Sequence, residues 1–159
     1  MNIPFGSLAL NYEVIKLPNN NYLCVGRRLF NANDFTALGF EIGGVNNPSQ
    51  IDVVVEVDVN SGEIVWEWNI KDHVIQERDA NLNNYGVIAD HPELLDMDAL
   101  STYDWTFTES FMINGMDYNP ELDQIALSVR KMSEVIIIDH STTTAEAASH
   151  NGGNSGKRW

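Results

Sequence analysis

The stretch "NGMDYNPELDQIALSVRKMSEVIIIDHSTTTAEA", from Asn114 to Ala147, holds the pattern that decides the fold. Apolar residues alternate with polar ones in "QIALSV" and cluster in "EVIII", and the turn-forming residues of "NPELD" precede the first run. Short apolar runs bounded by Asn, Pro, Gly and Asp are typical of β-strands joined by tight turns. Arg130 stands between the two runs, so a cation ends a strand that is otherwise predicted to be buried.

The same alternation of strand and turn recurs along the chain. "PNNN" and "VNSG" are turn sequences, and each lies between two apolar runs, which is the signature of a hairpin. Trp66 and Trp68 alternate with Glu67, so both rings are predicted to lie on one strand face and to pack against a neighbouring sheet. Strands are predicted at residues 10–17, 22–30, 51–58, 63–70, 112–118, 124–130 and 134–140.

Helix signals are scarce. A short helix is predicted within residues 91–100, with Asp90 as its N-cap and Pro92 in its first turn. Residues 31–50 show no regular pattern and are predicted to form a loop; loops of this length in compact domains are usually functional or mobile.

Length and composition limit the classes of function. The chain of 159 residues predicts one domain, and its 43% hydrophobic content is enough for a core. The net charge of −14 argues against nucleic acid and against anionic membrane surfaces as partners. Cys24 lies in an apolar run and is predicted to be a small buried hydrophobe. The four histidines show no metal-ligand spacing, so neither a metal nor a cofactor is predicted.

Two segments of the chain repeat. Pro18, Leu23 and Arg28 align without a gap with a second proline, apolar residue and arginine 102 positions later, at Pro120, Ile125 and Arg130. An apolar strand that ends in Asp follows each hairpin. Two copies of this unit suggest an all-β fold with two antiparallel blades of a β-propeller.

The predicted domain covers residues 1–159 as a partial propeller. It contains a blade-like segment at 8–70, an insertion with a short helix at 71–105, a second blade-like segment at 106–148 and a glycine-rich tail at 149–159. Two blades cannot close a ring, because propellers have about four to eight. The chain is therefore expected to be part of a larger protein, an open pair of sheets, or a unit that assembles with other chains through open strand edges.

Asn114 and Arg130 are the candidate binding residues. In an antiparallel hairpin with its turn in "NPELD", Asn114 is predicted to lie opposite Arg130, with both side chains on one face. An amide and a guanidinium suit a tetrahedral oxyanion such as sulfate or phosphate. Ile125, Leu127 and Val129 then take the opposite face and pack. The alternative is that Arg130 pairs with one of the many carboxylates.

Several long phrases resemble the bacterial arylsulfotransferase family, whose members are built on a six-bladed propeller. They are "EVDVNSGEIVWEWNIKDHVIQERD", "NYGVIADHPELLD", "GGNSGK" and the stretch from Ile113 to Ala147, and "VIKLPNNNYL" is similar to the family's first hairpin. The resemblance implies sulfuryl transfer from a phenolic sulfate to a phenol acceptor through a sulfohistidine, as in other nucleophilic catalysis. It implies aryl sulfates and phenols as small-molecule partners, and a periplasmic or secreted protein, although no signal peptide is visible.

The resemblance also places the family's site on this sequence. The His-x-Asn motif falls on "MIN", so Asn114 is retained while Met112 replaces the histidine, and the family's arginine falls on Arg130. A further histidine is expected before Leu-Pro-Asn, where this chain has Asn11 and Tyr12. The nucleophilic histidine belongs beyond the glycine-rich segment, so no catalytic residue is assigned and no turnover is expected from this chain. The rival hypothesis is a non-catalytic binding or assembly module.

Overall fold

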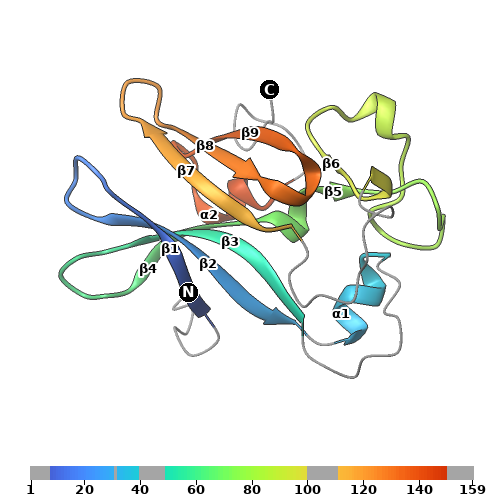
Figure 1. The fold of residues 1–159 in the computed structure, drawn as a ribbon, viewed down its shortest axis with the longest axis horizontal. Coiled ribbons are helices and arrows are strands. Elements are labelled where there is room, and N and C mark those ends of the chain that lie inside the picture. Colours follow the sequence, from blue (N-terminus) through green and yellow to red (C-terminus); the bar gives the residue numbers. More distant parts are fainter. Residues whose placement is uncertain (1–7, 31, 40–48, 100–110, 150–159) are drawn as a thin grey trace.

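Two antiparallel sheets form most of the molecule in the computed structural model, which describes residues 8–30, 32–39, 49–99 and 111–149 (Figure 1). The first sheet is a meander of four strands in chain order: β1 (Leu8–Lys16), β2 (Tyr22–Phe30), β3 (Ser49–Val57) and β4 (Ile64–Asn69). The second is a three-stranded meander of β7 (Ile113–Asn119), β8 (Gln124–Val129) and β9 (Glu134–Asp139).

Turn chemistry fixes the hairpins. Between β3 and β4, the Asp58 carboxylate accepts the amides of Asn60 and Ser61 at 3.0 and 2.8 Å, and Gly62 takes a φ of 70°, which glycine adopts without steric cost. Between β7 and β8, the Asn119 side chain accepts the amides of Glu121 and Leu122 in the same way. These local bonds explain why both turns were predictable from sequence.

The core lies between the two sheets. Trp66 and Trp68 of β4 are 4% and 2% exposed and belong to one cluster with the buried residues of β8 and β9, which confirms their predicted role in packing between sheets. The first strands of the two sheets, β1 and β7, are neighbours. Members of this cluster that are at most 2% exposed include Leu23, Ile51, Ile113, Ile125, Leu127, Val129 and Trp68.

A small lobe beside the sheets carries two short helical turns (Figure 1). It contains η2 (Ile70–His73), the parallel pair β5 (Val74–Ile75) and β6 (Leu95–Asp96), and η3 (Ile88–Asp90). The buried Gln76 holds its loop: its amide donates to the Asp79 carbonyl at 2.9 Å and its oxygen accepts two backbone amides. The lobe contacts the residue that follows α1 (Ala32–Ala37), because the Asn84 side chain donates to the Leu38 carbonyl at 3.0 Å.

A short C-terminal helix, α2 (Thr144–Ala147), covers the outer edge of β4. Thr143 caps it through a capping box with Glu146, and the Thr144 hydroxyl accepts the Glu67 amide at 3.1 Å. This contact occupies an edge donor that could otherwise pair with another strand. The predicted self-association through open edges stays a prediction.

The all-β prediction is confirmed, and the observed strands match the predicted ones closely. The sheets do not close a ring among the described residues, which is compatible with an incomplete propeller. The helix predicted within residues 91–100 is wrong: its apolar residues Leu94 and Leu95 are drawn into the core, and Leu95 pairs in β6. The loop prediction for 31–50 missed α1, and residues 40–48 of that loop lie outside the described residues, as does all but Ser149 of the predicted glycine-rich tail.

None of the helices in the described part of the chain has the length and apolar character needed to cross a lipid bilayer.

Candidate functional site

Arg130 lies just past the end of β8, where it opens a single 3₁₀ turn, η5 (Arg130–Met132). Its backbone amide donates to the Met112 carbonyl at 3.0 Å, which ties the turn to the start of β7. Its side chain is exposed, and within the described ranges no carboxylate forms an ion pair with it. The alternative interpretation, a guanidinium neutralised by a carboxylate, therefore finds no support in that part of the chain.

Asn114 occupies a β-bulge at the start of β7. Ile113 pairs with Val129 and Gly115 pairs with Ser128, so the register shifts by one residue and Asn114 has no residue opposite it. The predicted pairing of Asn114 with Arg130 across the hairpin is wrong, because the bulge absorbs the residue on which that register depended. The Asn114 side chain is nonetheless exposed, at the same end of the hairpin as Arg130.

The packing face of the same hairpin agrees with the prediction. Ile125, Leu127 and Val129 alternate along β8 and are all 0% exposed, so they face the core. The bulge therefore changes the register without changing which face of β8 is buried.

Met112, where the resemblance led us to expect a histidine, has a φ of 59°. This left-handed conformation is uncommon for a residue other than glycine. A buried carboxylate holds it, since Asp52 of β3 accepts the Met112 amide at 2.7 Å. Burial raises the pKa of Asp52 above its ordinary value, although Arg27 and the amides of Met112 and Ile113 act in the opposite direction.

The internal repeat gives Arg130 a counterpart. Arg28, at the equivalent position of the first sheet, lies inside β2 and makes a two-pronged contact with Glu67 of β4, at 2.8 and 2.5 Å. Both side chains are about 90% buried. The two arginines thus have different surroundings: Arg28 is neutralised inside the protein, whereas Arg130 presents its charge at the surface.

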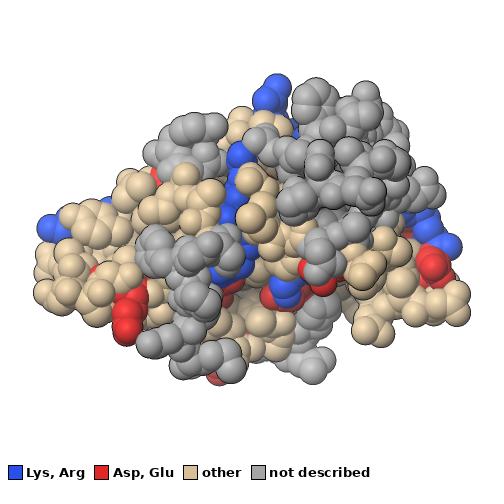
Figure 2. All heavy atoms as spheres, turned by 90° about the horizontal axis from the view of Figure 1, so that it is seen from below, with Lys and Arg blue, Asp and Glu red and all other residues tan. Residues whose placement is uncertain are grey.

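Positive charge reaches the surface although the chain as a whole carries −14. Figure 2 shows one face of the molecule, on which Lys and Arg atoms form a band across the middle with Asp and Glu atoms beside it. The described surface also has two hollows, of about 180 and 450 Å³, but neither is lined by Asn114 or Arg130.

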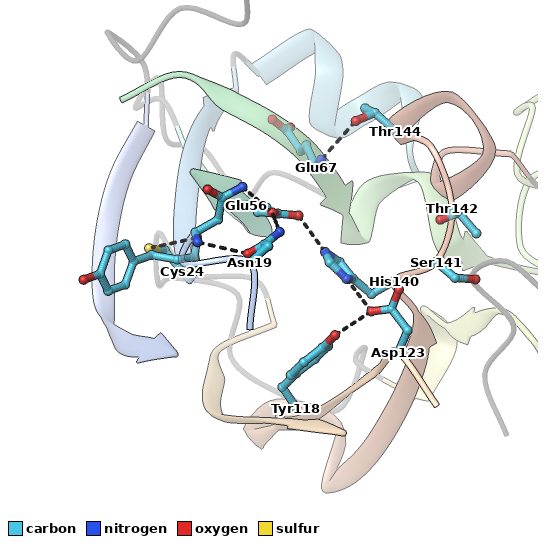
Figure 3. A network of polar contacts seen from close by, with 12 residues as sticks. Asn19, Cys24, Glu56, Glu67, Tyr118, Asp123, His140, Ser141, Thr142 and Thr144 are labelled. Carbon is cyan, nitrogen blue, oxygen red and sulfur yellow. Dashed lines mark hydrogen bonds and ion pairs between the residues drawn. The ribbon is translucent and has the colours of Figure 1, made fainter. Parts of the chain in front are cut away.

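A second polar cluster, which no local sequence pattern predicts, lies at the opposite end of the sheets (Figure 3). His140, which follows β9, bonds Glu56 of β3 through Nε2 at 3.0 Å and Asp123 of the β7–β8 turn through Nδ1 at 2.7 Å. Glu56 also accepts the side-chain amides of Asn19 and Asn21, at 2.8 and 2.6 Å. The cluster therefore joins the two sheets through one imidazole.

The protonation of this cluster follows from its bonds. Hydrogen bonding by His140, and by the two asparagines, lowers the pKa of Glu56 from 4.5 to about 2 despite its burial. Burial lowers the pKa of His140, but its bonds to Glu56 and Asp123 outweigh burial and raise it above 6.5. Burial and the hydrogen bond that the Tyr118 hydroxyl donates to Asp123 raise the pKa of Tyr118 to about 12. Since both ring nitrogens face carboxylates, this arrangement favours the imidazolium form of His140, in which both nitrogens donate.

Among the described residues, no group of three or more His, Cys, Asp or Glu side chains is arranged to hold a metal ion. Cys24 is 4% exposed, which confirms the prediction of a buried hydrophobe, and burial raises the pKa of its thiol.

Comparison with known families decides the ancestry. Residues 3–146 match the model of the family described as arylsulfotransferase (ASST). The chain belongs to the arylsulfotransferase family. No curated protein and no solved structure gives a significant match. The matched range takes in every described strand of this arylsulfotransferase-family chain, so the family resemblance is confirmed over residues 3–146, which do not include "GGNSGK".

In this arylsulfotransferase-family chain, two groups of polar residues lie at opposite ends of the second sheet. Asn114, Arg130 and Met112 lie together at one end of the second sheet, linked through the Met112 carbonyl. His140 and its partners lie at the β7–β8 turn, at the other end of the same strands. No local pattern announces His140, because Glu56 is 84 positions away in sequence.

Proposed function

We propose that this chain contributes the sulfate-binding part of an arylsulfotransferase site, with Arg130 and Asn114 as its ligands. The observation that carries the proposal is the exposed side chain of Arg130, with which no described carboxylate forms an ion pair, at the same end of the hairpin as the exposed side chain of Asn114. The neutralised Arg28 at the equivalent position shows what a purely structural arginine looks like in this fold.

The chemistry follows from these two groups. The guanidinium fork binds two oxygens of a sulfate at once, and an amide N–H adds a third donor. Together they offset the negative charge on a sulfuryl group as it moves from a phenolic sulfate to a phenol. In the family, the first step of this reaction forms a sulfohistidine.

We further propose that this chain alone does not turn over aryl sulfates. Met112 stands where the family has a histidine, and a thioether cannot donate a proton to a sulfate oxygen. Incubation with a chromogenic aryl sulfate and a phenol acceptor is expected to release no phenol above background. Turnover that depends on Arg130 would show that the site is complete without that histidine.

Sulfate is expected to stabilise the chain through Arg130. A ligand at 100 times its Kd raises the free energy of unfolding by about 2.7 kcal/mol, so a thermal shift on titration with sodium sulfate is measurable. Arg130→Ala is expected to abolish this shift. Lys131→Ala removes the same charge from the next residue of η5 and is expected to retain it, with sodium chloride at matched ionic strength as the salt control.

Equal shifts in wild type, Arg130→Ala and Lys131→Ala would mean that sulfate acts only as a stabilising salt, and the proposed site would be lost. A shift that persists in Arg130→Ala but disappears in Asn114→Ala would keep a sulfate site and remove Arg130 from it.

A further inference from the structure

We infer that Asp52 is a positioning residue for this site: its carboxylate, on one sheet, fixes the backbone that carries Asn114 and Arg130 in the other. The inference rests on the proposed function of those two residues and adds a residue from outside their hairpin.

Asp52 lies at the contact between the sheets. It belongs to β3, is 1% exposed, and pairs in register with Arg27 of β2. One carboxylate oxygen, Oδ1, accepts from the Arg27 Nε at 3.2 Å, and the other, Oδ2, accepts the Met112 amide at 2.7 Å. The second bond joins residues 60 positions apart, so it connects the first sheet to the residue directly before β7, the first strand of the second sheet.

The segment that Asp52 holds determines where both proposed ligands lie. Met112 needs support in its left-handed conformation, because a non-glycine residue there is strained unless its surroundings fix it. The Met112 carbonyl then accepts the Arg130 amide at 3.0 Å, and Asn114 follows two residues later in the bulge. A shift of Met112 would therefore move Arg130 and Asn114 relative to each other.

Charge balance supports the same role. A buried carboxylate near an anion site would repel the anion, and Arg27 offsets that charge on the side away from Met112. Glu67 offers a matched comparison, because it is also a buried carboxylate paired with an arginine of β2. Among the described residues, Glu67 bonds Arg28 and Thr144 and makes no bond to the segment that carries Met112.

The test measures sulfate affinity by calorimetry together with amide hydrogen exchange at Met112. Asp52→Ala, made together with Arg27→Gln so that no unpaired cation is left to attract the anion, is expected to weaken sulfate binding by about tenfold and to speed exchange of the Met112 amide by about tenfold, because it leaves that donor without its acceptor. The double variant Asp52→Asn with Arg27→Gln keeps an acceptor oxygen in a neutral amide pair and is expected to stay within about twofold of wild type in both. Glu67→Ala is expected to lower stability and leave sulfate affinity unchanged.

Three outcomes overturn the inference. Asp52→Ala could bind sulfate as wild type does, or Glu67→Ala could weaken binding equally, which would make the effect one of general stability. If Asp52→Ala does not fold, Asp52→Asn alone replaces it, and the measurement is exchange of the Met112 amide. Asparagine offers one acceptor oxygen to two donors, Arg27 and the Met112 amide, so exchange is expected to be faster than in the double variant Asp52→Asn with Arg27→Gln, and equal exchange would refute the role of Asp52. Failure of wild type to bind sulfate instead overturns the proposed function, and the exchange rate of Met112 still reports whether Asp52 holds that segment.

Discussion

His140→Ala is expected to lower the free energy of unfolding by about 3 kcal/mol at pH 6, because it removes one partner of a buried charged cluster. Among the described residues, only His140 bonds both Glu56 and Asp123. The side chains of His140 and Glu56 are each 9% exposed. This expected loss lies at the lower end of the range of about 3–5 kcal/mol for breaking a buried charged pair, because Asn19 and Asn21 still bond Glu56 in the variant. Urea unfolding followed by tryptophan fluorescence measures it.

The effect is expected to depend on pH in a defined window. The pKa of His140 is raised above 6.5, so its contribution is complete below that pH and disappears as pH rises through the folded-state value. The pKa of Glu56 is lowered from 4.5 to about 2, so its contribution is present above pH 4.5 and disappears as pH falls toward 2. The difference between wild type and His140→Ala is therefore largest between about pH 4.5 and 6.5.

His91→Ala is the matched control. His91 also bonds a glutamate, Glu93, at 2.9 Å, but its side chain is 45% exposed, so the loss is expected to stay below about 1 kcal/mol. Equal losses in the two variants, or a His140→Ala loss that is constant from pH 5 to 9, would contradict an imidazolium link between the sheets.

Trp68→Ala is expected to cost about 3–5 kcal/mol, the range for deleting a large buried aromatic side chain. Trp68 is 2% exposed, belongs to the core that both sheets share, and stacks on His73 with ring centroids 4.8 Å apart. Domains of this size are stable by only about 5–15 kcal/mol, so the variant is expected to lose a large part of its stability. Thermal and urea unfolding check this directly.

Val65→Ala separates the core effect from strand propensity. Val65 lies in the same strand but is 53% exposed, so its replacement is expected to cost less than about 1 kcal/mol. Similar losses for the two variants would show that the two sheets do not share a tightly packed core around Trp68.

The sequence predicted most strands because their signals are local. The apolar face of β8 follows from the alternation of Ile125, Leu127 and Val129. The β3–β4 and β7–β8 turns are fixed by side chains within three residues of the amides they bind. The predicted helix after Asp90 failed for the opposite reason, since Leu95 pairs with Val74 across the lobe and no local signal records that partner.

The candidate site was predictable only in part. Family resemblance pointed to Asn114 and Arg130, and the structure places both at one end of the second sheet. The sequence did not reveal the bulge at Asn114, because a one-residue register shift leaves the alternation of β8 intact. Nor did it reveal Asp52, which reads as one polar residue in a run of valines.

By itself, the amino-acid sequence determined the strands, the tight turns and the family, because each depends on residues close together in the chain or on long matching phrases. Only the tertiary structure decided which polar groups pair. When the sheets pack, Arg28 bonds Glu67, the Met112 amide donates to Asp52 and His140 bonds Glu56, across 39, 60 and 84 positions of sequence. Packing also decides which arginine is neutralised and which faces solvent, because exclusion of water favours pairing only for the charges it buries.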